Sequence, residues 1–190
     1  MVDIDGVISL FGFDRSGAQA HSPEGRASEG LVGRRARPDG TFHSIDGIPH
    51  FLSSTAAAHL LALASVFDLV WASGWEEKAE EYLPRLLGLP AGLPFLRFER
   101  RAGTGARTGT GAGSSMNAHW KLDAVDAHAA DRPLAWIDDA FDESCHAWSA
   151  ARSASTLLVQ TAPSYGLTAR EASLLETWAR ELVDNEAGLR

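Results

Sequence analysis

Cysteine and long apolar segments are scarce in this chain. Cys145 is the single cysteine among 190 residues, which excludes a disulfide within one chain and is typical of a reducing compartment. No apolar run approaches the roughly 20 residues that cross a bilayer, and the N-terminus has no basic region followed by an apolar stretch of the kind that directs secretion. We therefore expect a cytoplasmic protein that does not contact a membrane.

Positive charge is also in deficit. The chain carries 17 lysines and arginines against 25 aspartates and glutamates, a net charge of −8. The average field of such a protein repels nucleic acid, so binding to a polyanion would need a local basic patch. Two stretches are candidates for such a patch, the first with Arg34, Arg35 and Arg37 and the second with Arg97, Arg100, Arg101 and Arg107.

The remaining composition is that of an ordinary globular protein, with 45% hydrophobic and 22% charged residues. The length fits one domain, and we expect it to span residues 1–190. Within it we expect a loop and hairpin insert at residues 14–51 and a flexible, glycine-rich loop at residues 102–117. The insert alternates in TFHSIDGIPHF and turns at Asp46-Gly47, which predicts the hairpin.

Expected strands and helices alternate along the chain, which predicts an α/β fold. Specifically, we expect a three-layer, Rossmann-like domain with a mostly parallel, five-stranded sheet, a small hairpin or flap and no large cap domain. The expected strands are Val2–Ile8, Phe67–Ala72, Phe95–Phe98, Leu134–Ile137 and Thr156–Gln160. The expected helices are Thr55–Ser65, Trp75–Leu87, Leu122–Ala130, Glu143–Ala151 and a last one after Thr168, where Glu171 completes a capping box.

The glycine-rich stretch AGTGARTGTGAGSS, from Ala102 to Ser115, does not have the spacing of a nucleotide-binding loop. A P-loop would end in Gly-Lys-Ser or Gly-Lys-Thr, and a dinucleotide-binding fold would space its glycines as G-x-G-x-x-G. A flexible loop is the interpretation that this stretch favours.

Polar residues follow several of the expected strands. Asp3 and Asp5 stand in the first, Ser73 follows the second, and Asp138 and Asp139 follow the fourth. Lys121 precedes the fourth strand, at the start of a helix. Ligands bind beyond the carboxyl ends of parallel strands, and carboxylates with a hydroxyl and a lysine suit phosphoryl transfer with a hard cation such as Mg²⁺. Each residue also has a plainer interpretation as a helix cap, a turn residue or a solvated charge.

Four short motifs carry a resemblance to a known family. DIDGV, the serine in VWASGW, the lysine in HWKLDAV and the acidic pair in AWIDD, in that order, resemble the four motifs of the haloacid dehalogenase-like (HAD) superfamily of phosphatases. A response-regulator receiver is disfavoured because its acidic pair lies on the first strand and its lysine comes last, whereas here Lys121 precedes the acidic pair Asp138-Asp139. More narrowly, four stretches resemble the HAD domain of bacterial "Swiss Army Knife" RNA repair proteins: VWASGWEEKAEEYLPRLLGLP, HWKLDAV, LAWIDD and LLVQTAPSYGLT.

The resemblance implies catalytic roles. Asp3 would be the nucleophile that becomes an aspartyl phosphate, and Asp5 would be the general acid and then the general base. Ser73 would hydrogen-bond a phosphoryl oxygen and Lys121 would neutralise its charge. Mg²⁺ would be held by Asp3, by the backbone carbonyl of Asp5 and by Asp138, with support from Asp139 or Asp142.

Substrate-binding residues are expected around Ser73 and Lys121. Gly74 follows Ser73, and Trp75 and Trp120 are candidates for the rim, where an aromatic face could stack a base or sugar. Packing under the site is the competing interpretation of these tryptophans. Trp71 and Trp136, each two residues before a site residue, are expected in the core.

We expect a Mg²⁺-dependent phosphomonoester hydrolase with an open site, acting on nucleic-acid phosphate ends as in RNA repair. A small phosphorylated metabolite is the alternative substrate, and a non-catalytic phosphate-binding or interaction module on the same fold is the alternative function. Only Met1 and Val2 precede Asp3, a shorter strand than the resemblance implies, so we expect a chain extended upstream to be more stable.

Overall fold

The computed structural model describes residues 1–12, 38–98 and 117–188. In chain order, the elements are β1 (Ser9–Leu10), β2 (Gly40–Ile45), β3 (Ile48–Ser53), α1 (Ser54–Leu63), α2 (Glu77–Leu87), η2 (Ala118–Lys121), α3 (Leu122–Ala129), β4 (Leu134–Asp138), α4 (Glu143–Ala151), β5 (Thr156–Gln160) and α5 (Ala169–Gly188). The expected flexible loop and most of the expected insert before the hairpin lie outside the described residues, as do all the clustered arginines except Arg97.

The fold is α/β, but the predicted five-stranded, mostly parallel, Rossmann-like sheet is wrong. The strands instead form a three-stranded antiparallel sheet in the order β1-β3-β2 and a two-stranded parallel sheet of β4 and β5. In the parallel sheet, Leu134 pairs with Thr156 and Asp138 with Gln160. Of the five predicted strands, these two are the ones that form ladders in the predicted place.

The other three predicted strands are reduced to isolated parallel bridges. Val2 bridges Trp71 and Ile137, and Trp71 bridges Phe95. The backbone hydrogen bonds explain why no longer ladders form. The chain turns back after Ile4, whose carbonyl accepts the amides of Val7, Ile8 and Ser9. The Phe67 amide still bonds to Leu63 at the end of α1, and the Phe98 amide donates to the Glu76 side chain at 3.0 Å.

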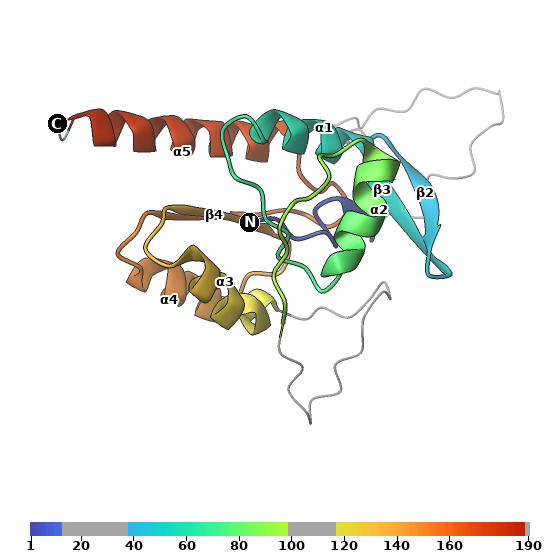
Figure 1. Ribbon diagram of the computed structural model, residues 1–190, viewed down its shortest axis with the longest axis horizontal. Coiled ribbons are helices and arrows are strands. Elements are labelled where there is room, and N and C mark those ends of the chain that lie inside the picture. The colour runs from blue at the N-terminus through green and yellow to red at the C-terminus, as the bar shows by residue number, and fades with distance from the viewer. Residues whose placement is uncertain (13–37, 99–116, 189–190) are drawn as a thin grey trace, which may run out of the picture.

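The predicted hairpin is confirmed by β2 and β3, which pair from Gly40 with Ser53 to Ile45 with Ile48. Asp46 and Gly47 form the two-residue turn with φ of 52° and 80°, the left-handed conformation that such turns require. The turn is held against α2, because the Asp46 carboxylate accepts hydrogen bonds from Lys78 and Tyr82. Figure 1 shows this hairpin beside α2, at one end of the molecule.

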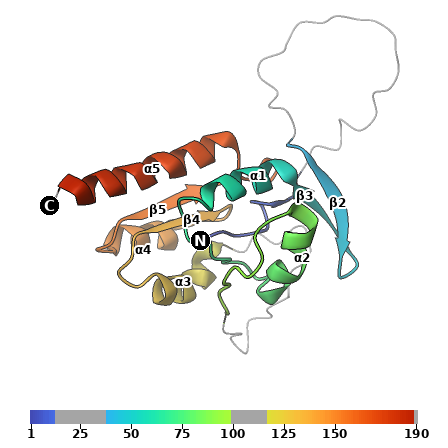
Figure 2. The ribbon, with the colours of Figure 1, turned by 45° about the horizontal axis from the view of Figure 1, so that its top comes forward.

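All five predicted helices are present, and four of them cover two sides of the parallel sheet. Helices α1 and α5 lie on one side of β4 and β5, and α3 and α4 lie on the other (Figures 1 and 2). The cap of α5 is confirmed: the Thr168 amide donates to the Glu171 carboxylate at 3.2 Å. None of the helices in the described ranges has both the length and the apolar character needed to cross a membrane.

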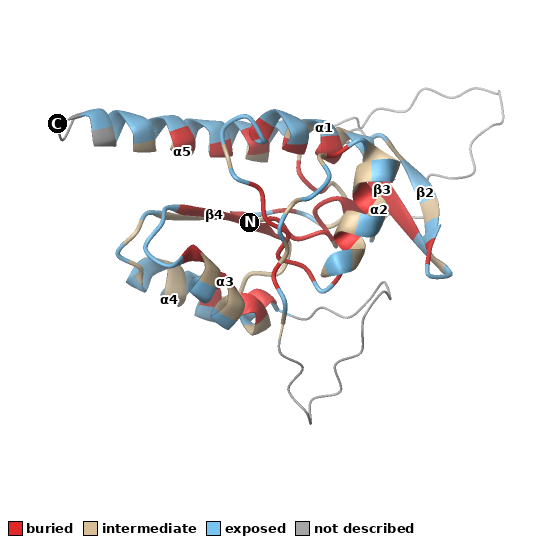
Figure 3. Cartoon of the chain, viewed as in Figure 1, coloured by how far each residue is buried: buried red, intermediate tan, exposed pale blue. Residues whose placement is uncertain are grey.

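Two hydrophobic clusters fill the space between the strands and the helices. The larger contains Val2, Ile137 and residues of α1 and α5, and the smaller contains Trp136 with residues of α3 and α4. Trp71 and Trp136 are 1% and 0% exposed, which confirms their predicted place in the core. Buried residues concentrate where the N-terminal segment meets β4 (Figure 3). The N-terminal segment therefore lies in the middle of the protein, and its acidic residues enter a largely buried environment.

Candidate active site

Asp3 is held beside β4 by the backbone. The Val2 amide donates to the Val70 carbonyl and the Asp3 amide to the Ile137 carbonyl, each at 2.9 Å. These bonds fix the residue on both sides, and Asp3 is only 6% exposed. Asp5 lies in the turn that follows and is partly exposed. The two acids of DIDG thus differ in their surroundings, as the predicted division of labour between them requires.

Gly6 allows the turn after Asp5 to pass close to Asp139. Its φ is 72°, and a Cβ placed on it would lie 2.4 Å from Asp139 Cγ. Any other residue at this position would strain the backbone and displace the Asp139 carboxylate. The glycine of the DIDG motif is therefore required by the close approach of the N-terminal turn to the segment after β4.

Lys121 joins the N-terminal segment to β4. Its Nζ lies 3.0 Å from Asp3 Oδ2 and 2.7 Å from Asp138 Oδ2. Lys121 ends η2, whose first amide, that of Ala118, donates to the Ala140 carbonyl at 2.8 Å. Lys121 and Asp138 are 4% and 1% exposed. The structure therefore brings together three predicted site residues that are far apart in the sequence.

Burial and mutual repulsion change how these groups bind protons. Burial, and then the charge of Asp3, raise the pKa of Asp5 to about 7 and that of Asp138 to about 6. Burial and the charges of Asp3 and Asp138 likewise raise the pKa of Asp139 to about 7. Burial lowers the pKa of Lys121, but the charges of Asp3 and Asp138 outweigh it and hold that pKa above its usual value. Together, the clustered aspartates can carry more negative charge than Lys121 alone can neutralise.

Asp139 and Asp142 take different positions, which bears on the choice that the sequence left open. One carboxylate oxygen from each of Asp3, Asp138 and Asp139 lies within 4.8 Å of the others. Asp142 instead caps α4, where its side chain accepts the Cys145 amide at 3.2 Å, and it also contacts His119 at 3.0 Å. The structure therefore places Asp139 among the clustered acids and gives Asp142 the capping role.

Ser73 and Gly74 lie where the chain leaves its bridge to Val2. Ser73 is 1% exposed, so its side chain is almost fully enclosed. Gly74 is next to Trp120, whose ring would lie 3.8 Å from a Cβ at position 74. Trp120 is partly exposed, and Lys121 Nζ lies 5.5 Å from its ring centroid. Trp120 is thus a neighbour of both Lys121 and the Ser73-Gly74 segment.

Trp75 lies deeper than the rim position that the sequence suggested. It is 5% exposed, and its indole Nε1–H donates to Asp5 Oδ2 at 3.0 Å. The ring centroid of His50, on β3, lies 4.9 Å from that of Trp75, in an edge-on arrangement. Trp75 therefore contacts a predicted catalytic carboxylate directly through its polar edge.

Sequence reasoning missed two residues that support the site. Thr161 follows β5, is 4% exposed, and its hydroxyl donates to the Gly6 carbonyl at 2.9 Å. His50 is 7% exposed and packs on Trp75. A polar residue directly after a strand was the available signal for Thr161. Nothing in the sequence around His50 distinguishes it from the other six histidines.

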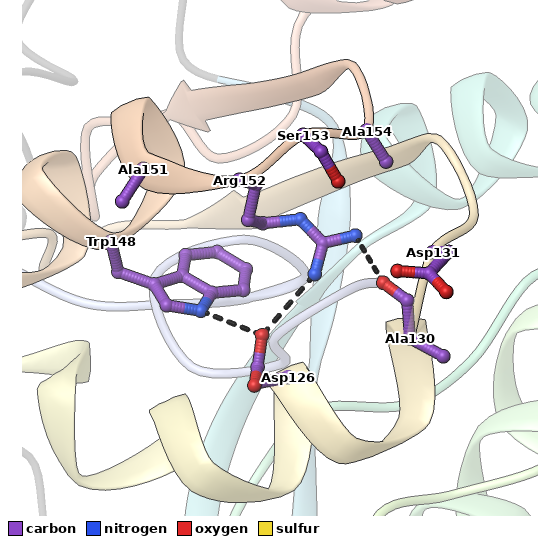
Figure 4. Close-up of a pocket in the computed structure, with 8 residues that line it drawn as sticks. All are labelled: Asp126, Ala130, Asp131, Trp148, Ala151, Arg152, Ser153 and Ala154. Atoms are coloured by element: carbon purple, nitrogen blue, oxygen red, sulfur yellow. Dashed lines mark hydrogen bonds and ion pairs between the residues drawn. The ribbon is translucent and has the colours of Figure 1, made fainter.

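The large cavity shown in Figure 4 lies away from these residues. It has a volume of about 350 Å³ and is lined by the C-terminal parts of α3 and α4 and by the segments that lead into β4 and β5. Its walls are tied to one another, because the Arg152 guanidinium contacts Asp126 and the Ala130 carbonyl. The acidic group, which consists of Asp3, Asp138 and Asp139, lies at the carboxyl end of β4. The cavity lies at the other end of that strand, where the chain leads into it.

Comparisons with known proteins add no relative. No protein-family model matches the chain, and neither a curated protein nor a solved structure is significantly similar to it.

Proposed function

We propose that this protein is a Mg²⁺-dependent phosphomonoester hydrolase of the HAD-like type that works through an aspartyl phosphate on Asp3. The observation that carries the proposal is the contact of Lys121 Nζ with both Asp3 and Asp138, at 3.0 and 2.7 Å, within a buried group of acids. A lysine and clustered carboxylates from separate elements are the groups that bind and transfer a phosphoryl group.

The clustered acids fit a divalent cation. Carboxylate oxygens are preferred Mg²⁺ ligands, and Asp3, Asp138 and Asp139 each offer one within the same small volume. The raised pKa values of Asp138 and Asp139 reflect burial and repulsion, both of which a cation would offset. Asp3, Asp138 and the Asp5 carbonyl would hold the ion, with Asp139 in support. When bound, Mg²⁺ would stabilise the negative charge of the phosphoryl group.

The reaction itself is assigned to Asp3 and Asp5. An Asp3 oxygen forms a bond to phosphorus while the bond from phosphorus to the leaving oxygen breaks, and that oxygen takes a proton from Asp5. Asp5 then removes a proton from the water that attacks phosphorus, which releases phosphate and restores the Asp3 carboxylate. A pKa of about 7 lets Asp5 hold a proton near neutral pH. Ser73 would donate a hydrogen bond to a phosphoryl oxygen.

For the substrate, we infer a phosphorylated nucleic-acid end, as in RNA repair. Trp120 supports this choice: it is partly exposed beside Lys121 and Gly74, and Phe98 packs edge-on against it with ring centroids 4.5 Å apart. Such a ring could stack a base next to the phosphate site. Rates on 3′- and 5′-phosphorylated oligonucleotides, compared with rates on nucleotides and phosphorylated metabolites, test the choice. Activity on metabolites alone would contradict it.

The proposed activity is tested by hydrolysis of 4-nitrophenyl phosphate with Mg²⁺. We expect Asp3→Asn to abolish turnover because an amide cannot attack phosphorus. The control is Asp46→Asn, which changes an exposed acid at the hairpin turn and should keep wild-type activity. Equal activity of Asp3→Asn and wild type would refute the role of Asp3. Tight binding of phosphorylated ligands without turnover would instead favour the non-catalytic module.

A further inference from the structure

Trp75 makes a direct and directional contact with Asp5. The indole Nε1–H donates to Asp5 Oδ2 at 3.0 Å, across 70 positions of the sequence. An indole nitrogen can only donate a hydrogen bond, so Oδ2 must act as the acceptor in this contact. Trp75 is 5% exposed, so water competes little for this bond.

The position of Trp75 is set by the antiparallel sheet. His50, in β3, packs edge-on against the indole with a centroid distance of 4.9 Å and an interplanar angle of 71°. The His50 ring is itself held, because Nδ1 and Ser9 Oγ are hydrogen-bonded at 3.0 Å. Ser9 and His50 are 3% and 7% exposed. A buried chain of contacts thus leads from β1 through β3 to the Asp5 carboxylate.

We propose that Trp75 is a positioning residue that fixes which oxygen of Asp5 delivers the proton to the leaving group. The proposal rests on the proposed function of Asp5 as the general acid. Because Oδ2 accepts the indole hydrogen, the acidic proton is placed on Oδ1, and the carboxyl group is prevented from rotating. The leaving oxygen therefore meets the protonated oxygen of Asp5 in a single orientation.

The step affected is the cleavage of the bond between phosphorus and the leaving oxygen. As the Asp3 oxygen bonds to phosphorus, the electron pair of the breaking bond moves to the leaving oxygen, which takes the hydrogen from Asp5 Oδ1. The Asp5 carboxylate that remains keeps its bond from Trp75. A leaving group that is stable as an anion needs this proton little, whereas a basic leaving group depends on it.

The test compares two substrates of similar shape in one enzyme preparation. Phenyl phosphate releases a much more basic phenolate than 4-nitrophenyl phosphate. Trp75→Phe keeps an aromatic ring and removes the N–H donor. We expect its kcat to fall by about 10-fold or more on phenyl phosphate and by less than about 3-fold on 4-nitrophenyl phosphate. The ratio of the two rates is unaffected by partial unfolding, because both substrates meet the same active enzyme.

Trp148→Phe is the matched control. It also removes an indole bond to a carboxylate, from Trp148 Nε1 to Asp126 at 2.9 Å, but at the cavity remote from the acidic group. The two rates of this variant should keep the wild-type ratio. A double-mutant cycle adds a second measurement: in an Asp5→Asn background, Trp75→Phe should leave the ratio unchanged because the acid is already absent.

The outcomes separate this proposal from the proposed function. Hydrolysis of both substrates by the wild type, with an unchanged rate ratio in Trp75→Phe, would overturn the role of Trp75 and leave the phosphatase assignment intact. Failure of the wild type to hydrolyse either substrate with Mg²⁺ would overturn both. A selective loss on phenyl phosphate that disappears in the Asp5→Asn background would support the positioning role.

Discussion

At the scale of single residues, Lys121 is the group on which the acidic cluster depends most. Its Nζ is the cation placed between Asp3 and Asp138, and all three residues are buried. Removing one member of a buried ionic group leaves uncompensated charge, which costs about 3 kcal/mol or more. Under the proposed function, we therefore expect the position of this lysine to matter for both stability and activity.

Lys121→Met tests this dependence. We expect kcat with Mg²⁺ to fall by about 100-fold or more, because the variant lacks the charge that we propose neutralises the phosphoryl group. The melting temperature should also fall, and Mg²⁺ should recover part of the loss. Kinetics on 4-nitrophenyl phosphate and thermal unfolding measure the two effects. Lys78→Met is the control, since Lys78 pairs with Asp46 at the exposed hairpin turn; comparable losses of activity in both variants would contradict the assignment.

Asp139 and Asp142 allow a matched pair of substitutions in one short segment. Asp139→Asn should raise the Mg²⁺ concentration needed for half-maximal activity by about 10-fold, because it weakens a carboxylate at the proposed ion site. Asp142→Asn should leave that concentration unchanged, since asparagine caps a helix as well as aspartate does. Activity titrated with Mg²⁺ measures both variants. A larger effect of Asp142→Asn would transfer the supporting role to Asp142.

Which site residues can be predicted from sequence depends on what fixes their position. Asp138 is the last residue of β4 and Lys121 the last residue of η2, and those elements bring the two side chains together. Trp75 is different, because it stands in the short segment between Ser73 and α2, where no regular element orients it. Its direction is set by His50, from a strand far away in sequence. The sequence suggested that the aromatic face of Trp75 lies at the rim of the site. It could not show that the indole N–H donates to Asp5 instead.

At the scale of elements, the helices and the hairpin were predictable and the sheet was not. Helical spacing, the capping box and the Asp46-Gly47 turn are local signals, and each was confirmed. Strand formation depends on partners elsewhere in the chain. The apolar stretch from Val2 to Ile8 has the composition of a buried strand, but the Ile4 carbonyl captures three following amides and the chain turns back. Local composition cannot show where backbone bonds are diverted in this way.

Arg152, like Lys121, is a cation that joins separate elements, but its role is structural. Its side chain is 7% exposed, and it donates to Thr156 Oγ1 and to the carbonyls of Ala130 and Arg132 at 2.8 to 2.9 Å. These bonds tie the end of α4 to the start of β5 and to the segment between α3 and β4. Figure 4 shows the guanidinium beside the Trp148 ring, at a centroid distance of 5.1 Å.

Arg152→Ala should therefore lower the free energy of unfolding by about 2 to 4 kcal/mol without changing kcat per folded molecule. The loss arises because two carbonyls and a hydroxyl lose their donor. Urea unfolding and active-site-normalised kinetics measure the two quantities. Arg180→Ala, on the exposed face of α5, should cost less than about 0.5 kcal/mol. A change in kcat of Arg152→Ala would show that this cavity is coupled to the acidic site.

At the scale of the whole molecule, the acidic group lies where separate parts of the fold meet. The N-terminal segment packs in the larger hydrophobic cluster, whereas η2, which carries Lys121, adjoins the smaller one. The acids are thus held by both halves of the core, and their burial is a cost that folding must offset. This cost should make the stability of the whole protein sensitive to Mg²⁺ and to pH.

The sign of the pH effect follows from the raised pKa values. Asp5 and Asp139 have pKa values of about 7 and Asp138 of about 6, above those of an unfolded chain. The stability that their protonated forms contribute is fully present below about pH 4 and is lost as pH rises through 6 to 7. Burial has the opposite effect on Met1, whose amino group has its pKa lowered to about 5. At each pH, the Met1 amino group contributes equally to the stability with and without Mg²⁺. Its contribution therefore cancels when the two melting temperatures are compared.

We therefore expect Mg²⁺ to raise the melting temperature more at pH 8 than at pH 5.5, by about 3 °C or more. At pH 8 the carboxylates of Asp138 and Asp139 are ionised, and a bound cation would reduce the repulsion among the clustered acids. At pH 5.5 protonation of these carboxylates has already reduced that repulsion, so the cation adds less stability. Scanning calorimetry with and without Mg²⁺, at ionic strength matched with KCl, measures the difference. Asp139→Asn should reduce the increment at pH 8. An increment that is equal at both pH values, or absent from both, would contradict a cation site formed by Asp3, Asp138 and Asp139.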